Sequence, residues 1–200
     1  EMNTLLKNMM LALLSLGIVQ AVWADDVPDL QKTLQSARQG NAAAQFNLGL
    51  MYDKGQGGVR QDHAEAFKWY SQAAKQGFVL AQYNLGVMYD RGLGVRKDYA
   101  QAVKWYRQAA QQGFAQAQYN LGVMYYDGLG VRKDYSQAAK WMRQTAQQGN
   151  ARAQYNLGVM YAEGQGVRQN LKVAKEWFGM ACNNGNQSGC ENYRRLQSVY

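Results

Sequence analysis

The stretch AQYNLGVMYDRGLGVRKDYAQAVKWYRQAAQQG spans residues 81–113, and a near-copy of it spans residues 117–149. Two weaker copies flank them, so that landmark residues recur every 36 or 37 positions. The recurring glycines are Gly49, Gly86, Gly122 and Gly158, and the recurring tryptophans are Trp69, Trp105, Trp141 and Trp177. Self-similarity at a fixed period of this length is typical of repeat proteins built from stacked helical units.

Each repeat has the features of a helix, a loop and a second helix. Small and apolar residues occur at every fourth position from Ala81 to Tyr89, as on one face of a helix. This helix is expected to end near Gly92, and Asp98 is a preferred residue type for the start of the next helix. A single pair of helices cannot bury both of its apolar faces, whereas a stack of pairs can. The sequence therefore predicts an all-α fold, an α-solenoid of helix–loop–helix repeats.

The N-terminal segment has the layout of a secretory signal peptide. Lys7 precedes an apolar run from Met9 to Val22, and small residues follow just before Asp25. The run is shorter than the roughly 20 apolar residues of a membrane span, although an uncleaved anchor is the alternative. We expect cleavage, no transmembrane span afterwards, and a periplasmic, secreted or cell-surface location in a Gram-negative bacterium.

The period of the repeat and the predicted signal peptide divide the chain into consecutive segments. The expected segments are a signal peptide at 1–24, an N-terminal cap at 25–40, repeats at 41–77, 78–113, 114–149 and 150–185, and a C-terminal cap at 186–200. Each cap resembles half of a repeat, which would close one end of the stack.

The net charge of the chain indicates which kinds of partner to expect. The net charge of +8 favours acidic partners or anionic surfaces. Because the chain is expected to be exported, nucleic acid is not an expected partner.

Cys182 and Cys190 lie eight residues apart, and a disulfide is the default interpretation for two cysteines in an exported chain. One histidine and a bonded cysteine pair do not make a zinc site, so no metal or cofactor is expected.

Residues 81–113 resemble the Sel1-like repeat, a relative of the tetratricopeptide repeat, and the resemblance covers about residues 25–197. It implies a right-handed α-solenoid with a concave face lined by the first helix of each repeat. It also implies an adaptor or scaffold in signalling, secretion or bacterium–host contact. The cysteine pair is similar to the helix-bridging disulfides of the secreted cysteine-rich branch, in which every repeat carries one. The earlier repeats of this chain have alanine and glutamine there instead: Ala74/Gln82, Ala110/Gln118 and Ala146/Gln154.

Two ladders on the first helices are candidates for a ligand groove. They are the aromatic residues Phe46, Tyr83, Tyr119 and Tyr155 and the asparagines Asn47, Asn84, Asn120 and Asn156, with Leu50, Val87, Val123 and Val159 on the same stripe. An asparagine both donates to and accepts from a peptide backbone, so the ladders would suit an extended peptide. The alternative is that each asparagine bonds within its own repeat. The acidic residues expected at one end of the groove are Asp53, Asp90, Asp127 and Glu163.

A second regular feature is a basic ridge in the loops. It comprises Arg60, Arg96, Arg132 and Arg168, joined by Lys97 and Lys133, with Lys68, Lys104 and Lys140 recurring on the second helices. Such charges commonly keep a repeat protein soluble. The functional alternative is contact with an anionic envelope or host-surface component.

An enzyme has little support in the sequence. Some cysteine-rich relatives are described as β-lactamases or penicillin-binding proteins, whose chemistry uses an S-x-x-K motif. Ser71 with Lys75 and Ser136 with Lys140 are one residue too far apart, and the chain has no SDN or KTG motif. His63 occurs in one repeat alone and is expected to be an ordinary surface residue. The sequence therefore predicts a protein- or peptide-binding adaptor, with β-lactamase activity as the alternative.

Overall fold

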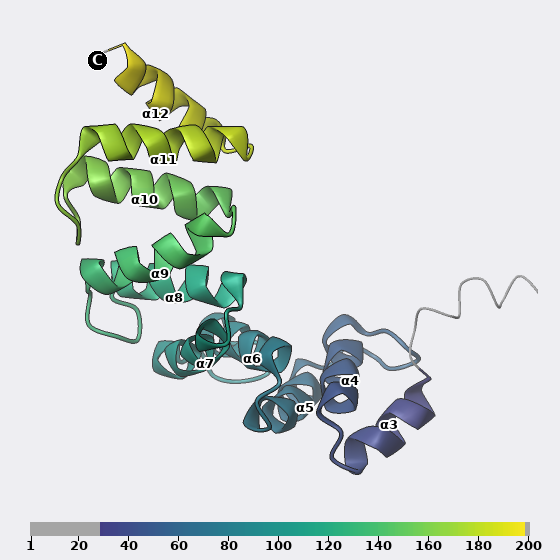
Figure 1. Ribbon diagram of the computed structural model, residues 1–200. Helices are drawn as coiled ribbons and strands as arrows, with labels where there is room; N and C mark the ends of the chain where they lie inside the picture. The colour runs from purple at the N-terminus through teal and green to yellow at the C-terminus, as the bar shows by residue number, and fades with distance from the viewer. Residues whose placement is uncertain (1–28, 199–200) are drawn as a thin grey trace, which may run out of the picture.

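The computed structural model describes residues 29–198, which hold ten α-helices and no strand (Figure 1). The helices are α3 (Leu30–Arg38), α4 (Ala42–Lys54), α5 (His63–Lys75), α6 (Val79–Arg91), α7 (Tyr99–Gln111), α8 (Ala115–Asp127), α9 (Tyr135–Gln147), α10 (Ala151–Glu163), α11 (Leu171–Asn183) and α12 (Gln187–Gln197). The predicted signal peptide and the first residues of the predicted N-terminal cap lie outside the described residues. No helix in the range 29–198 is both long and apolar enough to cross a membrane.

The helices pack in sequence order along a curved array, with α3 and α12 at opposite ends (Figure 1). Four helix pairs form the body of the array, and we call them units 1 to 4: α4 with α5, α6 with α7, α8 with α9, and α10 with α11. The second helix of each unit packs on the first helix of the next, α3 packs on α4, and α12 packs on α11. This arrangement confirms the all-α fold and the α-solenoid.

Local sequence signals determine where the helices begin and end. In unit 2, α6 ends at Gly92, which adopts a left-handed conformation with φ 73° that glycine reaches without steric cost. The next helix starts after Asp98, whose carboxylate accepts a hydrogen bond from the Gln101 backbone N–H. The same two devices recur in all four units: Gly55, Gly92, Gly128 and Gly164 end the first helices, and Asp62, Asp98, Asp134 and Asn170 cap the second ones.

The repeated glycine of the first helix allows the two helices of a unit to approach closely. A methyl group at Gly86 would lie 2.6 Å from Cδ1 of Tyr106, a buried residue of the second helix. Tyr70 and Phe178 pack on the corresponding glycines in units 1 and 4. Unit 3 differs, because Met142 takes the place of the aromatic ring.

Contacts between units fix the spacing of the stack. The loop of unit 2 lies on the start of the second helix of unit 1, where a methyl group at Gly94 would collide with the His63 carbonyl oxygen. Gly94 also has a positive φ of 66°, so glycine is required there on two grounds. Gly130 on Tyr99 and Gly166 on Tyr135 repeat this contact. Each loop therefore sets the position of its unit on the preceding one.

A buried glutamine bridges successive units. The Gln82 side-chain N–H donates to the Ala74 carbonyl oxygen of unit 1 at 3.2 Å, and its amide oxygen accepts from Gln112 at 2.7 Å. Gln45, Gln118 and Gln154 repeat the bridge, and all four glutamines are 4% exposed. At the end of the stack, the disulfide between Cys182 and Cys190 joins the corresponding positions of α11 and α12.

Candidate functional site

Two neighbouring hollows lie along the first helices of units 2 to 4. The pocket between units 3 and 4, here called the 3–4 pocket, has a volume of about 350 Å³. Its lining residues are Tyr119, Val123, Tyr126, Asp127, Met142, Tyr155, Asn156 and Val159. Five residues of the predicted ladders and their stripe therefore face one space: two tyrosines, two valines and Asn156.

The second hollow, here called the 2–3 pocket, is wider, at about 540 Å³. Tyr83, Val87, Tyr106 and Asn120 line it, and the N-terminal end of α10 borders it at Arg152. Tyr119 lines both pockets, so that the two hollows meet at its ring. We call the two pockets together the tyrosine groove.

The aromatic ladder is not equivalent from unit to unit. The Tyr83 ring lies 5.9 Å from the Tyr106 ring and 5.0 Å from the Phe114 ring, measured between centroids. Phe46 has the same two kinds of neighbour in Tyr70 and Phe78, at 5.7 and 5.2 Å. Tyr155 lies 5.7 Å from Phe178. Around Tyr119 the corresponding positions are Met142 and Asn150, and its ring has no aromatic partner among the described residues.

Three asparagines of the ladder, Asn84, Asn120 and Asn156, contact the preceding unit. Asn120 lies beside the Tyr106 hydroxyl, which also donates to the Asp90 carboxylate at 3.4 Å. Asn84 lies beside the corresponding hydroxyl of Tyr70, which is buried without a hydrogen-bond partner of standard geometry among the described residues. Asn156 of unit 4 meets no phenol, because Met142 replaces the tyrosine in unit 3, and the Asn156 amide nitrogen lies 3.9 Å from the Met142 sulfur. Internal contacts of the asparagines thus cross between units, whereas the alternative interpretation placed them within one repeat.

Burial controls the ionisation of the tyrosines below the groove. It raises the pKa of Tyr106 far above its ordinary value, and the nearby Asp90 carboxylate raises it further. The pKa of Tyr70 is raised in the same way by burial and then by Asp53. Both phenols therefore stay protonated well above physiological pH.

The four acidic residues do not share one environment. Asp53 and Asp90 come four residues after the repeated glycine, but Asp127 and Glu163 come five residues after it. A one-residue shift rotates a side chain by about 100° around a helix. Asp90 accordingly lines the 2–3 pocket and contacts Tyr106, whereas Tyr126 occupies its position in unit 3. The four residues therefore do not form a single acidic end of the groove: Asp90 lines the 2–3 pocket and Asp127 lines the 3–4 pocket.

The predicted basic ridge is exposed and separate from the groove. Arg60, Arg96, Arg132 and Arg168 are all exposed, and none of them lines the 3–4 or the 2–3 pocket. Two of the associated lysines lie over neighbouring rings, Lys97 over Tyr99 at 4.6 Å and Lys133 over Tyr135 at 5.6 Å. Two lysines of the ridge therefore already interact with aromatic rings of the same chain.

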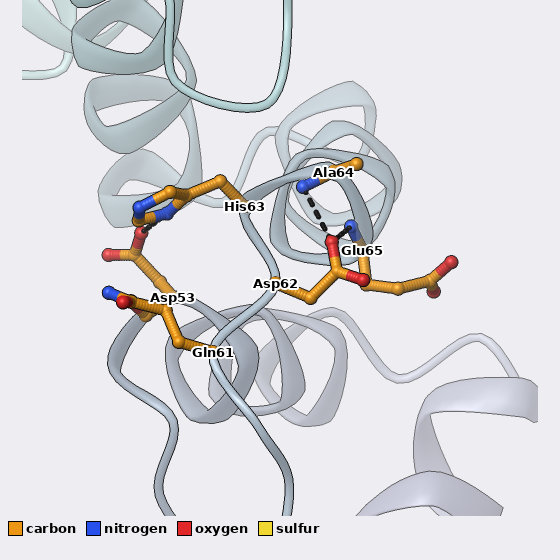
Figure 2. Close-up of polar contacts among 6 residues, drawn as sticks. All are labelled: Asp53, Gln61, Asp62, His63, Ala64 and Glu65. Atoms are coloured by element: carbon orange, nitrogen blue, oxygen red, sulfur yellow. Dashed lines mark hydrogen bonds and ion pairs between the residues drawn. The ribbon is translucent and has the colours of Figure 1, made fainter.

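His63 is not an ordinary surface residue. Its Nδ1 lies 2.9 Å from the Asp53 carboxylate, and both side chains are about one third exposed (Figure 2). Gln61 reaches the Asp53 backbone carbonyl oxygen at 2.8 Å from the same loop. Asp62, between them, caps α5 through the N–H groups of Ala64 and Glu65. The cluster ties the end of α4 to the start of α5 in unit 1.

The serines considered for acyl transfer make backbone contacts. The Ser71 hydroxyl donates to the Phe67 carbonyl oxygen at 2.6 Å, and the Ser136 hydroxyl donates to the Gly166 carbonyl oxygen at 3.4 Å. Within residues 29–198, no group of three or more histidine, cysteine or acidic side chains is arranged to hold a metal ion.

Sequence reasoning missed Tyr126 and Met142, which complete the 3–4 pocket. The available signal was a break in the repeat: Met142 stands where Tyr70, Tyr106 and Phe178 stand in the other units. It also missed that glutamines form the bridges between units, having treated those positions only as missing cysteines.

Comparison with known proteins gives a consistent assignment. The family model described as the Sel1 repeat matches residues 42–78, 79–114, 115–150 and 151–186. No curated protein matches the chain. Among solved structures, a protective antigen present in uropathogenic Escherichia coli strains, with an SLR fold, is 43% identical with a TM-score of 0.76. The match covers 80% of this chain and 34% of the antigen.

Two further structures are similar. A Sel1 repeat protein from Oxalobacter formigenes is 37% identical with a TM-score of 0.71, over 82% of this chain and 64% of that one. Cysteine rich protein B from Helicobacter pylori is 22% identical with a TM-score of 0.52, over 68% of this chain and 98% of that one, and shares the fold. The chain thus spans about a third of the Escherichia coli antigen and just under two thirds of the Oxalobacter protein.

Proposed function

The chain belongs to the Sel1 repeat family, and from this premise we propose that it is an exported scaffold that holds a segment of a partner polypeptide in the tyrosine groove. Sel1 repeat proteins generally act in protein–protein interaction. The observation that carries the proposal is the pair of pockets that meet at Tyr119 and are lined by tyrosine, valine and asparagine. Aromatic rings offer apolar contact, and amides pair with peptide groups.

The groove suits an extended segment better than a compact small molecule. Its two pockets are open and neighbouring, and each combines tyrosine rings with an asparagine of the ladder, Asn120 in one and Asn156 in the other. An extended peptide presents side chains and backbone amides alternately along its length, so it would use both pockets at once. Binding in two adjacent pockets also raises affinity more than either pocket alone.

Export and contact with a host or envelope component are part of the proposal. The disulfide supports export, because disulfides persist in oxidising compartments. The similar Escherichia coli protein is described as a protective antigen, which agrees with a location accessible to a host. The exposed basic ridge offers a second surface for anionic components.

Photo-crosslinking in cells tests the proposal. A photoreactive amino acid at position 119 is expected to capture one dominant polypeptide, whereas the same probe at position 132 on the basic ridge captures much less of it. Replacing Tyr119 and Asn120 together by alanine should abolish co-purification of that polypeptide while the protein stays folded by circular dichroism. Capture from position 132 alone would move the working surface to the ridge and contradict the groove.

A further inference from the structure

The 3–4 pocket differs from the rest of the groove in ways that indicate what it binds. In units 1 and 2 the groove ring lies between two aromatic side chains, as Tyr83 does with Tyr106 and Phe114. Tyr119 lacks both, because Met142 and Asn150 occupy those positions. The ring of Tyr119 is only partly buried, so it is available for stacking with an incoming group.

Three tyrosines and a sulfur surround this pocket. Tyr119, Tyr126 and Tyr155 line it, and Met142, which is 1% exposed, is buried at its base. Tyr126 is held in place by a hydrogen bond from its hydroxyl to the Gln165 amide oxygen at 2.8 Å and by the Tyr135 ring at 5.1 Å. The face of a tyrosine ring attracts a cation that lies within about 6 Å of its centre.

The charge of the pocket is negative. Asp127 is the one formally charged residue among the eight that line it, and it makes no ion pair with another described residue. The 2–3 pocket differs, because Asp90 shares it with Arg91 and Arg152. The net charge of +8 does not cancel the effect of Asp127, since salt screens exposed charges beyond about 8 Å.

Two hydrogen-bond acceptors of the pocket accept no hydrogen bond from the part of the chain that the structure describes. The Asp127 carboxylate can accept hydrogen bonds, and so can the amide oxygen of Asn156. Among residues 29–198, the hydrogen bond of the Asn156 side chain is the 3.9 Å contact from its amide nitrogen to the Met142 sulfur, which leaves the oxygen available. A guanidinium group is planar, stacks on aromatic faces and carries five N–H donors, whereas an ammonium group does not stack.

We propose that the 3–4 pocket binds an arginine side chain of the partner polypeptide, with the guanidinium stacked against Tyr119 and paired with Asp127. Tyr155 and Val159 would contact the aliphatic part of the side chain, and Asn156 would accept a further hydrogen bond. The inference rests on the proposed function, because it names the residue type that the groove selects.

Titration of the purified chain with short blocked peptides, followed by NMR, tests this inference. The probes are acetyl-Gly-Arg-Gly-amide, the same peptide with citrulline, which is isosteric and neutral, and the same peptide with phenylalanine. The arginine peptide is expected to shift the signals of Tyr119, Tyr126, Tyr155 and Asn156. Citrulline and phenylalanine peptides are expected to bind at least fivefold more weakly, because they lack the charge that meets Asp127.

Two variants and one matched control locate the binding. Asp127→Asn, at an exposed position, is expected to weaken arginine binding about fivefold without affecting the fold. Met142→Tyr restores the residue type of units 1 and 2 and is expected to close the pocket and abolish the shifts. Glu176→Gln removes a negative charge at an exposed position that lines neither pocket of the tyrosine groove, and it should leave binding of the arginine peptide unchanged.

Equal binding of the arginine and citrulline peptides would overturn the inference, and so would unchanged binding in both Asp127→Asn and Met142→Tyr. Stronger binding of the phenylalanine peptide would also overturn the inference, because it would show that the 3–4 pocket selects an aromatic side chain. These outcomes are distinguishable from failure of the proposed function. If crosslinking from position 119 captures a partner while the arginine peptide does not bind, the proposed peptide-binding function is supported. The assignment of the 3–4 pocket to arginine is then wrong.

Discussion

The buried side chain of Gln118 donates a hydrogen bond to the carbonyl oxygen of Ala110 in the preceding unit, at 3.2 Å. Cys182 and Cys190 are joined by a disulfide at the corresponding positions of the last junction. Equivalent positions therefore connect neighbouring helix pairs in two ways: by a hydrogen bond from glutamine inside the stack, and by a disulfide between α11 and α12.

Removal of a glutamine bridge should destabilise the stack. Gln118→Leu would remove two hydrogen bonds between units, the one from Gln118 to the Ala110 carbonyl oxygen and the one from Gln148 to Gln118. Each hydrogen bond contributes about 1 kcal/mol to the free energy of unfolding. Urea denaturation followed by circular dichroism is expected to show a lower midpoint. The control is Gln116→Leu on the exposed side of the same helix, which should change the midpoint little.

Reduction of the disulfide should loosen the C-terminal helix and leave the rest of the stack intact. Closing a loop of this length stabilises the folded state by about 2.5 kcal/mol in the chain-entropy model. Hydrogen exchange is the appropriate measurement: amides of α12 should lose protection in the reduced protein, while those of α6 to α9 keep it. Loss of protection throughout would mean that the disulfide supports the whole solenoid.

The repeated glycines should differ in how well they tolerate alanine. In Gly86→Ala the new methyl group would lie 2.6 Å from the Tyr106 ring, and we expect a loss of about 2–3 kcal/mol. In Gly122→Ala the nearest atom is Cγ of Met142 at 3.2 Å, in a flexible side chain, so a loss below about 1 kcal/mol is expected. Equal losses in thermal denaturation of the two variants would contradict this packing.

Stability should fall at alkaline pH because two buried tyrosines resist ionisation. The pKa of Tyr106 in the folded chain is raised above its ordinary value of 10.0, so its contribution is complete below that pH and is lost as pH rises above it. Each such group lowers the free energy of unfolding by about 1.4 kcal/mol per pH unit in that range.

The Tyr106→Phe variant isolates this effect. Urea denaturation at a series of pH values should show a shallower loss above pH 10 than in the parent chain, because one titrating group is gone. Comparing each curve with its own value at pH 7 separates this pH dependence from any change in packing caused by the substitution. Identical curves for Tyr106→Phe and the parent would show that other groups govern alkaline unfolding.

Much of the fold could be predicted from the repeat alone. The positions of Gly92 and Asp98 mark a helix end and a helix start through the backbone conformation and the capping that those residue types favour. The period also indicated which face is apolar, since Ala81 and Leu85 are buried and Tyr89 is half-buried. These properties depend on residues close together in the chain, so they can be inferred from local sequence.

The candidate site was only partly predictable. The ladders that contain Tyr119 and Asn156 were identified from their spacing, and the structure places both residues in one pocket. The pocket itself exists because Met142 interrupts the aromatic series and because Tyr126 replaces the acidic residue of the earlier units. The His63–Asp53 pair was missed for a similar reason, because it depends on how the loop folds back over α4.

The sequence by itself thus determined that the chain forms helix pairs, where each helix begins and ends, and that the pairs stack. Only the tertiary structure decided which side chains of neighbouring units meet, such as Asn120 with Tyr106 or Met142 with Asn156. The physical reason is that helix periodicity acts within a unit, whereas the rotation between units is set by contacts distant in sequence. Gly94 on the backbone of His63 is one such contact, and a period of 36 residues does not reveal its geometry.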